Sequence, residues 1–291
     1  MKIYKSLILG ILLIGCSTAL QAQQEPVYTL YRYNTGFFNP AALGADDQIT
    51  FKSNFRSQFV GIDDAPETQS FYLSLPLNEK VGIGLTTIVD NVFIEQATSL
   101  FASFSYKLQI GYATDLYFGI QAGGTFVSID FNRLELPLDP LFSQNANDFN
   151  PNLGIGFYLK NEGYFASLSS PRLLRTDRID DESGIVTTAN NELQIHLSGG
   201  YHFNLSDEIV FTPSTLVRFS SEETIVDITA TFKFLDRFEI GANYRADRAF
   251  GGLAYLSIQN WLELGYAYET NTSDINTFED GTHEIGLTFK F

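Results

Sequence analysis

Alternation between apolar and polar residues is the feature that most constrains the fold of this chain. In residues 224–234 every second residue is apolar, from Val226 to Phe234, and the residues between them are Asp, Thr or Lys. The same period of two recurs in residues 238–245 and 284–291. Successive side chains of a β-strand point to opposite faces, so these segments predict strands with one apolar face and one polar face.

Fourteen strands are predicted along the chain. They lie near residues 48–56, 67–77, 80–90, 97–109, 114–130, 151–160, 163–170, 190–203, 208–220, 224–235, 237–247, 250–259, 261–270 and 281–291. The connectors between them alternate in length. Tight connectors lie at 78, 110–113, 161–162, 204–207, 236 and 260. The intervening ones, at 57–66, 91–96, 131–150, 171–189 and 271–280, are mostly longer, although those near 221–223 and 248–249 are short.

The alternation of connector lengths separates two all-β architectures. Outer-membrane barrels have tight periplasmic turns at one rim and longer surface loops at the other, whereas a soluble sandwich has no reason to segregate its loops in this way. Strands of about ten residues cross a bilayer when they are tilted. We therefore predict a transmembrane outer-membrane β-barrel of about 14 antiparallel strands, with both termini on the periplasmic side. Aromatic residues at strand ends fit an interfacial girdle, namely Tyr106, Tyr158, Trp261, Tyr266 and Tyr268.

The first 22 residues have the pattern of an export signal peptide, with Lys2 and Lys5 before a short apolar run. Cleavage after Ala22 is favoured, and a lipoprotein box ending at Cys16 is the alternative. Beyond this leader no stretch approaches the roughly 18 consecutive apolar residues of a transmembrane helix. We expect three parts: the signal peptide at 1–22, a periplasmic or plug segment at 23–47, and the barrel at 48–291.

Charge and cysteine content exclude several functions. The chain has 34 acidic residues against 18 Lys and Arg, a net charge of −16. Without Lys2 and Lys5 the balance is 34 against 16, or −18. No cluster of Lys and Arg is available for phosphates, so nucleic acid is not an expected partner. The single cysteine, Cys16, lies in the leader, so the mature chain has no disulfide or cysteine metal site.

Candidate catalytic residues are few. The only imidazoles are His196, His202 and His283. No G-x-S-x-G elbow and no metal-ligand spacing accompanies them, so a structural role is the favoured interpretation. His283 and Glu284 are adjacent in the last strand and should face opposite sides. We expect no enzyme activity, no cofactor and no metal site.

Acidic loops leave calcium binding open. Asp63 with Asp64, and the acids at 177–182 and 274–280, lack the spacing of an EF-hand, and a solvated acidic loop is the commoner explanation. Three arginines, Arg172, Arg175 and Arg178, recur every third residue beside the second cluster. They pair with those acids or meet an acidic partner, and the sequence does not decide between the two.

Three segments of the chain together carry a family resemblance. The first is Gln24–Tyr28, continuing through Tyr31–Asn34 to Phe38–Ala41. The second is Phe55–Asp63 followed by Ala65–Ser70, with Phe59 where the family usually has Trp. The third comprises Val81–Leu85 with Asp90, and later Gly154–Gly156 and Leu168–Leu174.

In sequence and order these segments resemble the PorP/SprF family of type IX secretion membrane proteins from Bacteroidetes. The resemblance implies an outer-membrane barrel that works with type IX translocon components. Such a protein helps to export or attach one surface protein that carries a type IX C-terminal signal, often an adhesin of gliding motility. The implied localisation is the outer membrane, and the implied activity is binding without catalysis. Candidate partner-binding residues lie in two loops: Arg56, Gln58, Gly61, Asp63, Pro66, Gln69, Arg172, Arg175 and Arg178. An inward-folded loop is the alternative explanation for the first group.

A second hypothesis is a channel for small or hydrophobic solutes, like the fatty-acid transporters. The predicted inward face carries mixed polar groups: Lys52, Asn54, Gln121, Asp227, Lys233, Glu239, Asn243, Arg245 and Glu263. A barrel of this size holds either water or a plug, and alternation alone does not distinguish them. Asn39-Pro40 favours extended geometry before the proline, so we expect residues 24–47 to be irregular and tucked into or under the barrel.

Overall fold

A computed structural model of the chain describes residues 26–134, 146–174, 193–221, 223–272, 277 and 279–291. The predicted signal peptide, including Cys16, lies outside them. The strands are β1 (Thr50–Ser57), β2 (Glu67–Pro76), β3 (Val81–Val92), β4 (Glu95–Gln109), β5 (Thr114–Ile129), β6 (Ala146–Asn161), β7 (Tyr164–Ser170), β8 (Ile195–Tyr201), β9 (Phe203–Asn204), β10 (Ile209–Phe219), β11 (Thr224–Phe234), β12 (Phe238–Arg245), β13 (Ala249–Gln259), β14 (Leu262–Asn271) and β15 (Thr282–Lys290). Three short 3-10 helices are also present, η1 (Thr35–Phe37), η2 (Ala42–Ala45) and η3 (Phe131–Leu134).

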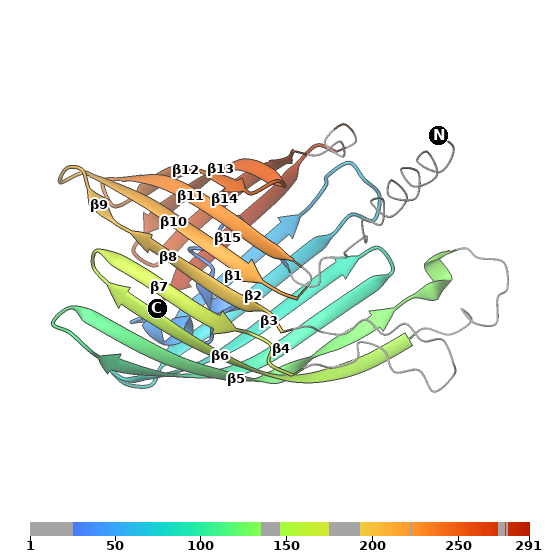
Figure 1. Ribbon diagram of the computed structural model, residues 1–291, viewed down its shortest axis with the longest axis horizontal. Coiled ribbons are helices and arrows are strands. Elements are labelled where there is room, and N and C mark those ends of the chain that lie inside the picture. The colour runs from blue at the N-terminus through green and yellow to red at the C-terminus, as the bar shows by residue number, and fades with distance from the viewer. Residues whose placement is uncertain (1–25, 135–145, 175–192, 222, 273–276, 278) are drawn as a thin grey trace, which may run out of the picture.

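The strands close into a ring (Figure 1). Neighbouring strands pair antiparallel in chain order, and β1 pairs with β15 from Thr50↔Lys290 to Ser57↔His283. The short strand β9 pairs with β10 beyond the end of the β8 pairing, so β8 and β9 are two parts of one wall strand. In the described part of the chain the fifteen strand segments therefore make fourteen wall strands, which confirms the predicted antiparallel barrel.

The two rims differ as predicted. The connections 77–80, 110–113, 162–163, 205–208, 235–237 and 260–261 lie at one rim, which we call the turn end (Figure 1, left). The other rim, the loop end, carries the connections that begin at residues 58, 93, 130, 171, 220, 246 and 272. Thr50 and Phe291 both lie at the turn end, as the even number of strands requires.

At two places the strands extend clearly beyond the predicted bounds. The expected loop at 91–96 is a turn of two residues, because β3 and β4 continue their pairing to Val92↔Glu95. Strand β6 begins at Ala146, before Pro151, where the prediction placed its start. Among the described residues β6 pairs with β7 only from Ile155 onward. Pro151 therefore lies in a stretch with one paired neighbour, where a missing N–H is tolerated.

The wall is polar inside and apolar outside. Along β4, Ser99 and Ser103 are 3% and 6% exposed, whereas the alternate Leu100 and Phe104 are 45% and 44% exposed. This inverted distribution is the one expected of a wall between lipid and a polar lumen. Among the described residues no helix is long and apolar enough to cross a membrane.

The predicted aromatic girdle is correct at four positions and wrong at one. Tyr106, Trp261, Tyr266 and Tyr268 are exposed on the outer face. Tyr158 instead faces the lumen, where it packs beside Tyr117. It shares the inward side of β6 with Gly154 and Gly156. The outward side of the same strand carries Leu153, Ile155, Phe157 and Leu159, so alternation placed Tyr158 on the inward side. The girdle prediction was wrong here because it relied on residue type at a strand end and not on this alternation.

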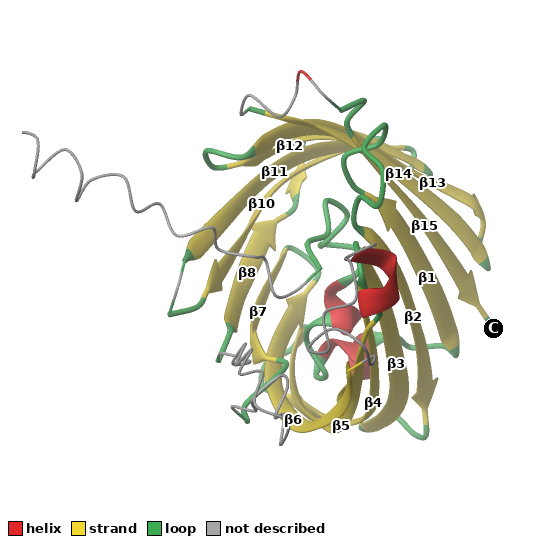
Figure 2. Cartoon of the chain, turned by 90° about the vertical axis from the view of Figure 1, so that its right-hand side faces the viewer, coloured by secondary structure: helices red, strands yellow, loops and turns green. Residues whose placement is uncertain are grey.

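Residues 26–47, which we call the lumenal segment, lie inside the ring of strands. Figure 2 looks into the loop end and shows η1 and η2 within the ring. All but a few residues from Val27 to Ala45 are buried. The irregular geometry expected for 24–47 is confirmed for the described part of it. Its first residues lie near the loop end, since Val27 borders Gln58 and Thr282, and the chain then passes to the turn end, where β1 begins. The expectation that both termini lie on the side of the tight turns is therefore correct for Phe291 and wrong for the described amino-terminal end, because the chain crosses the lumen before it enters the first wall strand.

Candidate partner-binding site

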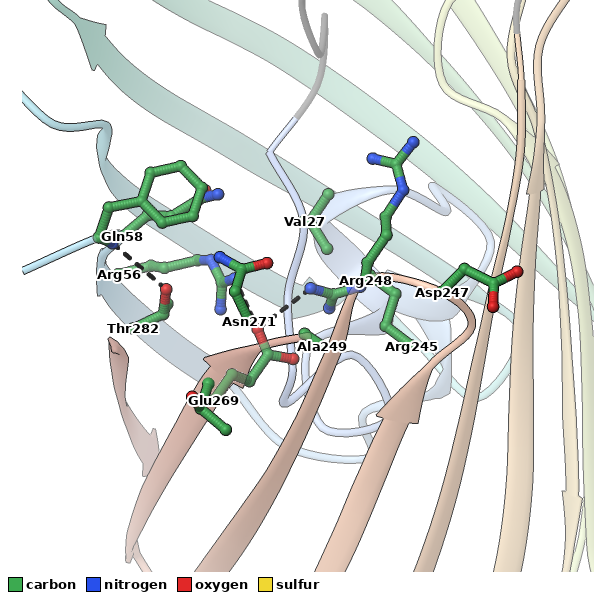
Figure 3. Close-up of a pocket in the computed structure, with 12 residues that line it drawn as sticks. Val27, Arg56, Gln58, Arg245, Asp247, Arg248, Ala249, Glu269, Asn271 and Thr282 are labelled. Atoms are coloured by element: carbon green, nitrogen blue, oxygen red, sulfur yellow. Dashed lines mark hydrogen bonds and ion pairs between the residues drawn. The ribbon is translucent and has the colours of Figure 1, made fainter. Parts of the chain in front are cut away.

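A polar cavity of about 220 Å³ opens at the loop end (Figure 3). Strands β1, β12, β13, β14 and β15 supply its wall, and Val27 of the lumenal segment borders it. Three arginines line it, Arg56, Arg245 and Arg248. These strands bring the arginines together because each one lies near the loop end of its strand or in the connection that follows.

Arg56, predicted to touch a partner, faces the lumen instead of the exterior. Its guanidinium donates to Glu269 Oε2 at 2.7 Å, to Glu284 Oε2 at 3.2 Å and to Thr29 Oγ1 at 3.0 Å. The side chain is 3% exposed. Arg56 therefore joins the barrel wall to the lumenal segment. Its side chain also lines the cavity, although little of it is exposed.

An inward charge chain, defined here as Arg218, Asp227, Arg245, Glu269, Arg56 and Glu284, crosses the wall from β10 to β1. Its links are Arg218 to Asp227 at 2.6 Å, Asp227 to Arg245 at 2.8 Å and Arg245 to Glu269 at 3.0 Å. Glu269 then pairs with Arg56, which also pairs with Glu284. Buried charges are tolerated when they are paired and hydrogen-bonded, and every member of this chain meets an opposite charge.

Several atoms of the charge chain nevertheless have no partner among the described residues. They are Arg218 Nε, Arg245 Nη2, Glu269 Oε1 and Arg56 Nε, all buried. The last three belong to side chains that line the cavity. A buried polar atom without a hydrogen bond is costly, so these groups would gain from a polar molecule that enters the cavity.

The loop from residue 58 to 66 stands beside this cavity and is tied to the neighbouring loop. Val60 N donates to Gly281 O at 2.9 Å, and Asp280 N donates to Val60 O at 2.6 Å. Gly61 has φ of +95°, a conformation that favours glycine. The loop is therefore held in one arrangement by main-chain bonds to its neighbour.

The remaining predicted contacts divide into exposed and partly covered residues. Gly61 and Asp63 are exposed at the tip of the loop. Gln58 lines the cavity, and its N–H donates to Pro66 O at 2.9 Å. Gln69 stands opposite Phe55 on the outer face of the wall. Only Gln58 joins Arg56 at the cavity.

The predicted arginine series is described only in part. Arg172 is half-buried near the loop end, where Nη2 lies 3.4 Å from Ser99 Oγ. Arg175 and Arg178 lie outside the described residues, as do the acids at 177–182. In the first of the three acidic loops, Asp64 forms an exposed ion pair with Arg133. Among the described residues no three His, Cys, Asp or Glu side chains gather in a group that could hold a metal ion.

The histidines do not form a common site. His196 faces the lumen beside Phe38, with 5.2 Å between ring centroids. His202 Nδ1 lies 2.9 Å from Thr212 Oγ1, near the turn end. His283 contacts Tyr266 on the outer face, while Glu284 faces inward, as their adjacency predicted.

A second cavity, of about 370 Å³, lies at the turn end. Arg32 and Tyr33 of the lumenal segment border it, and Arg32 pairs with Glu239. Burial raises the pKa of Tyr31 and raises that of Tyr33 well above its usual range, so both phenols stay neutral. Among the described residues Lys290 bonds to Glu263 at 2.6 Å and Lys233 to Asp236 at 3.2 Å.

Sequence reasoning missed Glu269 and Glu284 as members of the site. Alternation could have found both. Glu269 lies an even number of residues after Glu263, which was predicted to face inward, and Glu284 shares the polar side of the last strand with Thr288 and Lys290. The inward orientation of Arg56 follows in the same way from Lys52 and Asn54. Their mutual pairing depends on how strands far apart in the chain are juxtaposed.

Comparison with solved structures supports the fold. The barrel is similar to the Ralstonia pickettii toluene transporter TbuX, with a TM-score of 0.54, 8% identity and coverage of 87% of this chain and 92% of that chain. It is also similar to the monoaromatic hydrocarbon channel CymD, with a TM-score of 0.53, 10% identity and coverage of 87% and 91%. At such identities the likeness concerns the fold alone. No curated protein matches the sequence significantly.

The sequence itself matches one family model over nearly its whole length. Residues 20–289 match the model described as type IX secretion system membrane protein PorP/SprF. The barrel and this match together place the protein in the bacterial outer membrane. The chain therefore belongs to the PorP/SprF family of type IX secretion system membrane proteins.

Proposed function

We propose that this protein holds one exported surface protein at the outer membrane, by binding without catalysis, as an accessory of the type IX translocon. Membership of a secretion-system family supports the translocon role. The partner class is an exported protein with a type IX C-terminal signal, such as an adhesin of gliding motility.

The loop-end cavity is the single observation that carries the proposed binding site. It combines three arginines with the amide side chains of Gln58 and Asn271. The buried atoms Arg245 Nη2 and Glu269 Oε1 can each form one more hydrogen bond. A polar peptide segment offers both acceptors and donors, so it suits such a lining better than an apolar ligand would.

The neighbouring loops add a fixed frame around the cavity. The two main-chain bonds between Val60 and the 280–281 loop hold its rim, so a partner would not have to order this part of the rim on binding. The loops at 57–66, 131–150 and 171–189 extend the proposed contact surface, although only part of the second and third is described.

The first test is a gene deletion followed by a comparison of the surface proteome. We expect one large surface protein to be lost from the cells or released into the medium. If every surface protein is still displayed after the deletion, the proposed function is wrong.

The second test changes the cavity and keeps the barrel. Arg248→Glu places a carboxylate beside Glu223, with which Arg248 now pairs, and reverses one charge of the lining. Lys107→Glu is the matched control, since Lys107 lies at the turn end beside Asp115. We expect surface retention of the partner to fall only in the first variant, at equal barrel levels on immunoblots. Equal retention of the partner in both variants would show that the cavity is not part of the binding site.

The alternative function is a channel for small or hydrophobic solutes, the activity named for CymD and TbuX. It rests on the shared barrel architecture. Solute uptake by liposomes that contain the purified protein distinguishes it from partner binding, because a binding accessory need not increase permeability.

A further inference from the structure

The lumenal segment separates the two ends of the barrel. Val27 and the loop-end cavity lie on one side of it, and Arg32, Tyr33 and the turn-end cavity lie on the other. The two cavities share no lining residue. Between Val27 and the start of β1, the lumenal segment packs against strands on several sides of the ring.

One part of the wall is shaped to receive this segment. A Cβ added at Gly119 would lie 2.1 Å from Ala41 N, and one at Gly156 would lie 1.9 Å from Asn39 Oδ1. Gly82 and Gly84 leave similar room for Gly44 and Leu43, with added Cβ atoms 3.0 Å away from them. Any larger residue would collide with the segment, so glycine at these inward positions permits the close approach.

Polar side chains around the whole wall, the glycine-rich part included, satisfy the main chain of the segment. Glu284 accepts hydrogen bonds from Thr29 N at 2.7 Å and Leu30 N at 3.2 Å. Wall side chains donate to its carbonyls: Ser169 to Phe38, Ser105 to Ala41, Ser74 to Leu43, Lys52 to Tyr33 and Lys160 to Ala45. Irregular backbone at membrane depth persists only where protein or water satisfies it, and here the protein wall does so.

Side chains of the segment complete the fixation. Asn39 Nδ2 donates to Ser167 Oγ at 2.7 Å and to Phe157 O at 3.0 Å. Tyr33 stacks on Tyr255 of β13, with 4.0 Å between ring centroids. The segment is thus tied to strands on several sides of the lumen.

We propose that residues 26–47 are a fixed plug that enters the barrel from its loop end and closes the lumen to solutes. The short turns of outer-membrane barrels face the periplasm, so the loop end faces outward. The chain therefore reaches the outside of the cell at Pro26 before it passes inward to β1. This goes beyond partner binding, because it assigns the barrel a closed pore and an external approach of its amino-terminal segment.

Cysteine labelling tests the direction of threading. The predicted mature chain has no cysteine, so Pro26→Cys and Asp47→Cys each create a single reactive site. In intact cells a membrane-impermeant maleimide should label the first variant, and it should label the second only after the outer membrane is permeabilised. The reverse pattern, or labelling of Asp47→Cys in intact cells, overturns the proposal.

Conductance in planar bilayers tests closure. The purified wild-type protein should leave the bilayer conductance at its background level. Gly156→Leu should raise it, because the side chain displaces Asn39 and the segment with it. Gly252→Leu is the control, since a Cβ there meets nothing nearer than 3.8 Å, and it should stay closed.

A heat-modifiable gel shift verifies that each variant is a folded barrel before its conductance is read. Steady channels formed by the folded wild-type protein would overturn the proposal that the lumenal segment closes the barrel. Loss of partner retention without any change in labelling or conductance would concern the proposed function alone, so the failures of the two proposals are distinguishable.

Discussion

Strands β3–β6 and strands β10–β15 hold the same lumenal segment by different means. On the first side, glycines at 82, 84, 119 and 156 let the backbone of the segment approach closely. On the second side, together with β1, the inward charge chain ends on Glu284, which accepts from the main chain of the segment. On one wall the absence of side chains at the glycines allows close packing of the segment, and on the other wall hydrogen bonds to a paired carboxylate hold it.

This difference predicts how each wall fails. A charged wall loses its function when one member is removed, because the remaining charges are buried and unpaired. A glycine wall fails when atoms are added, because a packed interface has no room for them. Substitutions in the two walls should therefore differ in their cost to stability, and removal of a buried charge should cost more than one added carbon.

Glu284→Ala should have the largest effect on stability. It leaves Arg56 with one acidic partner fewer and removes the acceptor of two backbone N–H groups. Breaking a buried pair costs about 3–5 kcal/mol. Urea unfolding of the protein in micelles should show the loss, whereas Glu208→Ala, at an exposed turn, should leave the midpoint unchanged. Equal midpoints for the two variants would contradict a role for the charge chain.

Gly119→Ala tests the glycine wall with one added carbon. The Cβ would collide with the main chain at Ala41, and overpacking of this kind costs about 1–3 kcal/mol. Gly252→Ala is the matched control, because alanine in a strand is usually no worse than glycine. The same urea titration checks it. A variant as stable as the control would show that the segment does not touch β5.

Tyr28→Phe removes one hydroxyl between the segment and the wall. Tyr28 Oη lies 2.6 Å from Ser70 Oγ in a buried contact. Losing such a bond costs about 0.5–1.5 kcal/mol. Tyr112→Phe, at a fully exposed turn position, supplies the reference for removing a phenol alone. The difference in melting temperature between the two variants measures the contact, and no difference would argue against it.

Asp64→Asn at the loop end should have the smallest effect, because it removes the charge while asparagine tolerates the φ of +57° at this position. Asp64 and Arg133 form an exposed ion pair, with side chains 43% and 47% exposed. Exposed pairs contribute about 0–1 kcal/mol, and salt screens them. Stability measured at low and high salt should show a small difference that disappears at high salt. A large loss at both salt concentrations would mean that Asp64 supports the barrel in some other way.

The barrel could be predicted from the sequence because its signal is local. Alternation from Val226 to Phe234 and the rhythm of tight and longer connectors require no knowledge of distant contacts. Strand faces were assigned correctly wherever large apolar residues alternate with charged ones. Tyr158 was assigned to the wrong face because the girdle prediction used its aromatic type and its place near a strand end, although the alternation of Ile155, Phe157 and Leu159 placed it inward.

The site was less predictable because it depends on contacts between distant parts of the chain. Arg56 meets Glu269 and Glu284, more than 200 residues later, only when β1 closes the ring against β15. The position of the lumenal segment depends on inward glycines whose role appears only when Ala41 or Asn39 lies against them. Sequence alone left a plug and a water-filled lumen equally possible.

Burial of the lumenal segment against the glycine wall is tested most directly by amide hydrogen exchange of the folded protein in micelles. The N–H groups of Asn39, Ala41 and Gly44 bond only within the segment, to Thr35 O, Asn39 Oδ1 and Ala41 O. Such short local turns give little protection by themselves, so slow exchange requires that the barrel wall covers the segment. We expect these three amides to exchange far more slowly than those of an unstructured peptide. Exchange at unstructured-peptide rates in the folded barrel would contradict the plug.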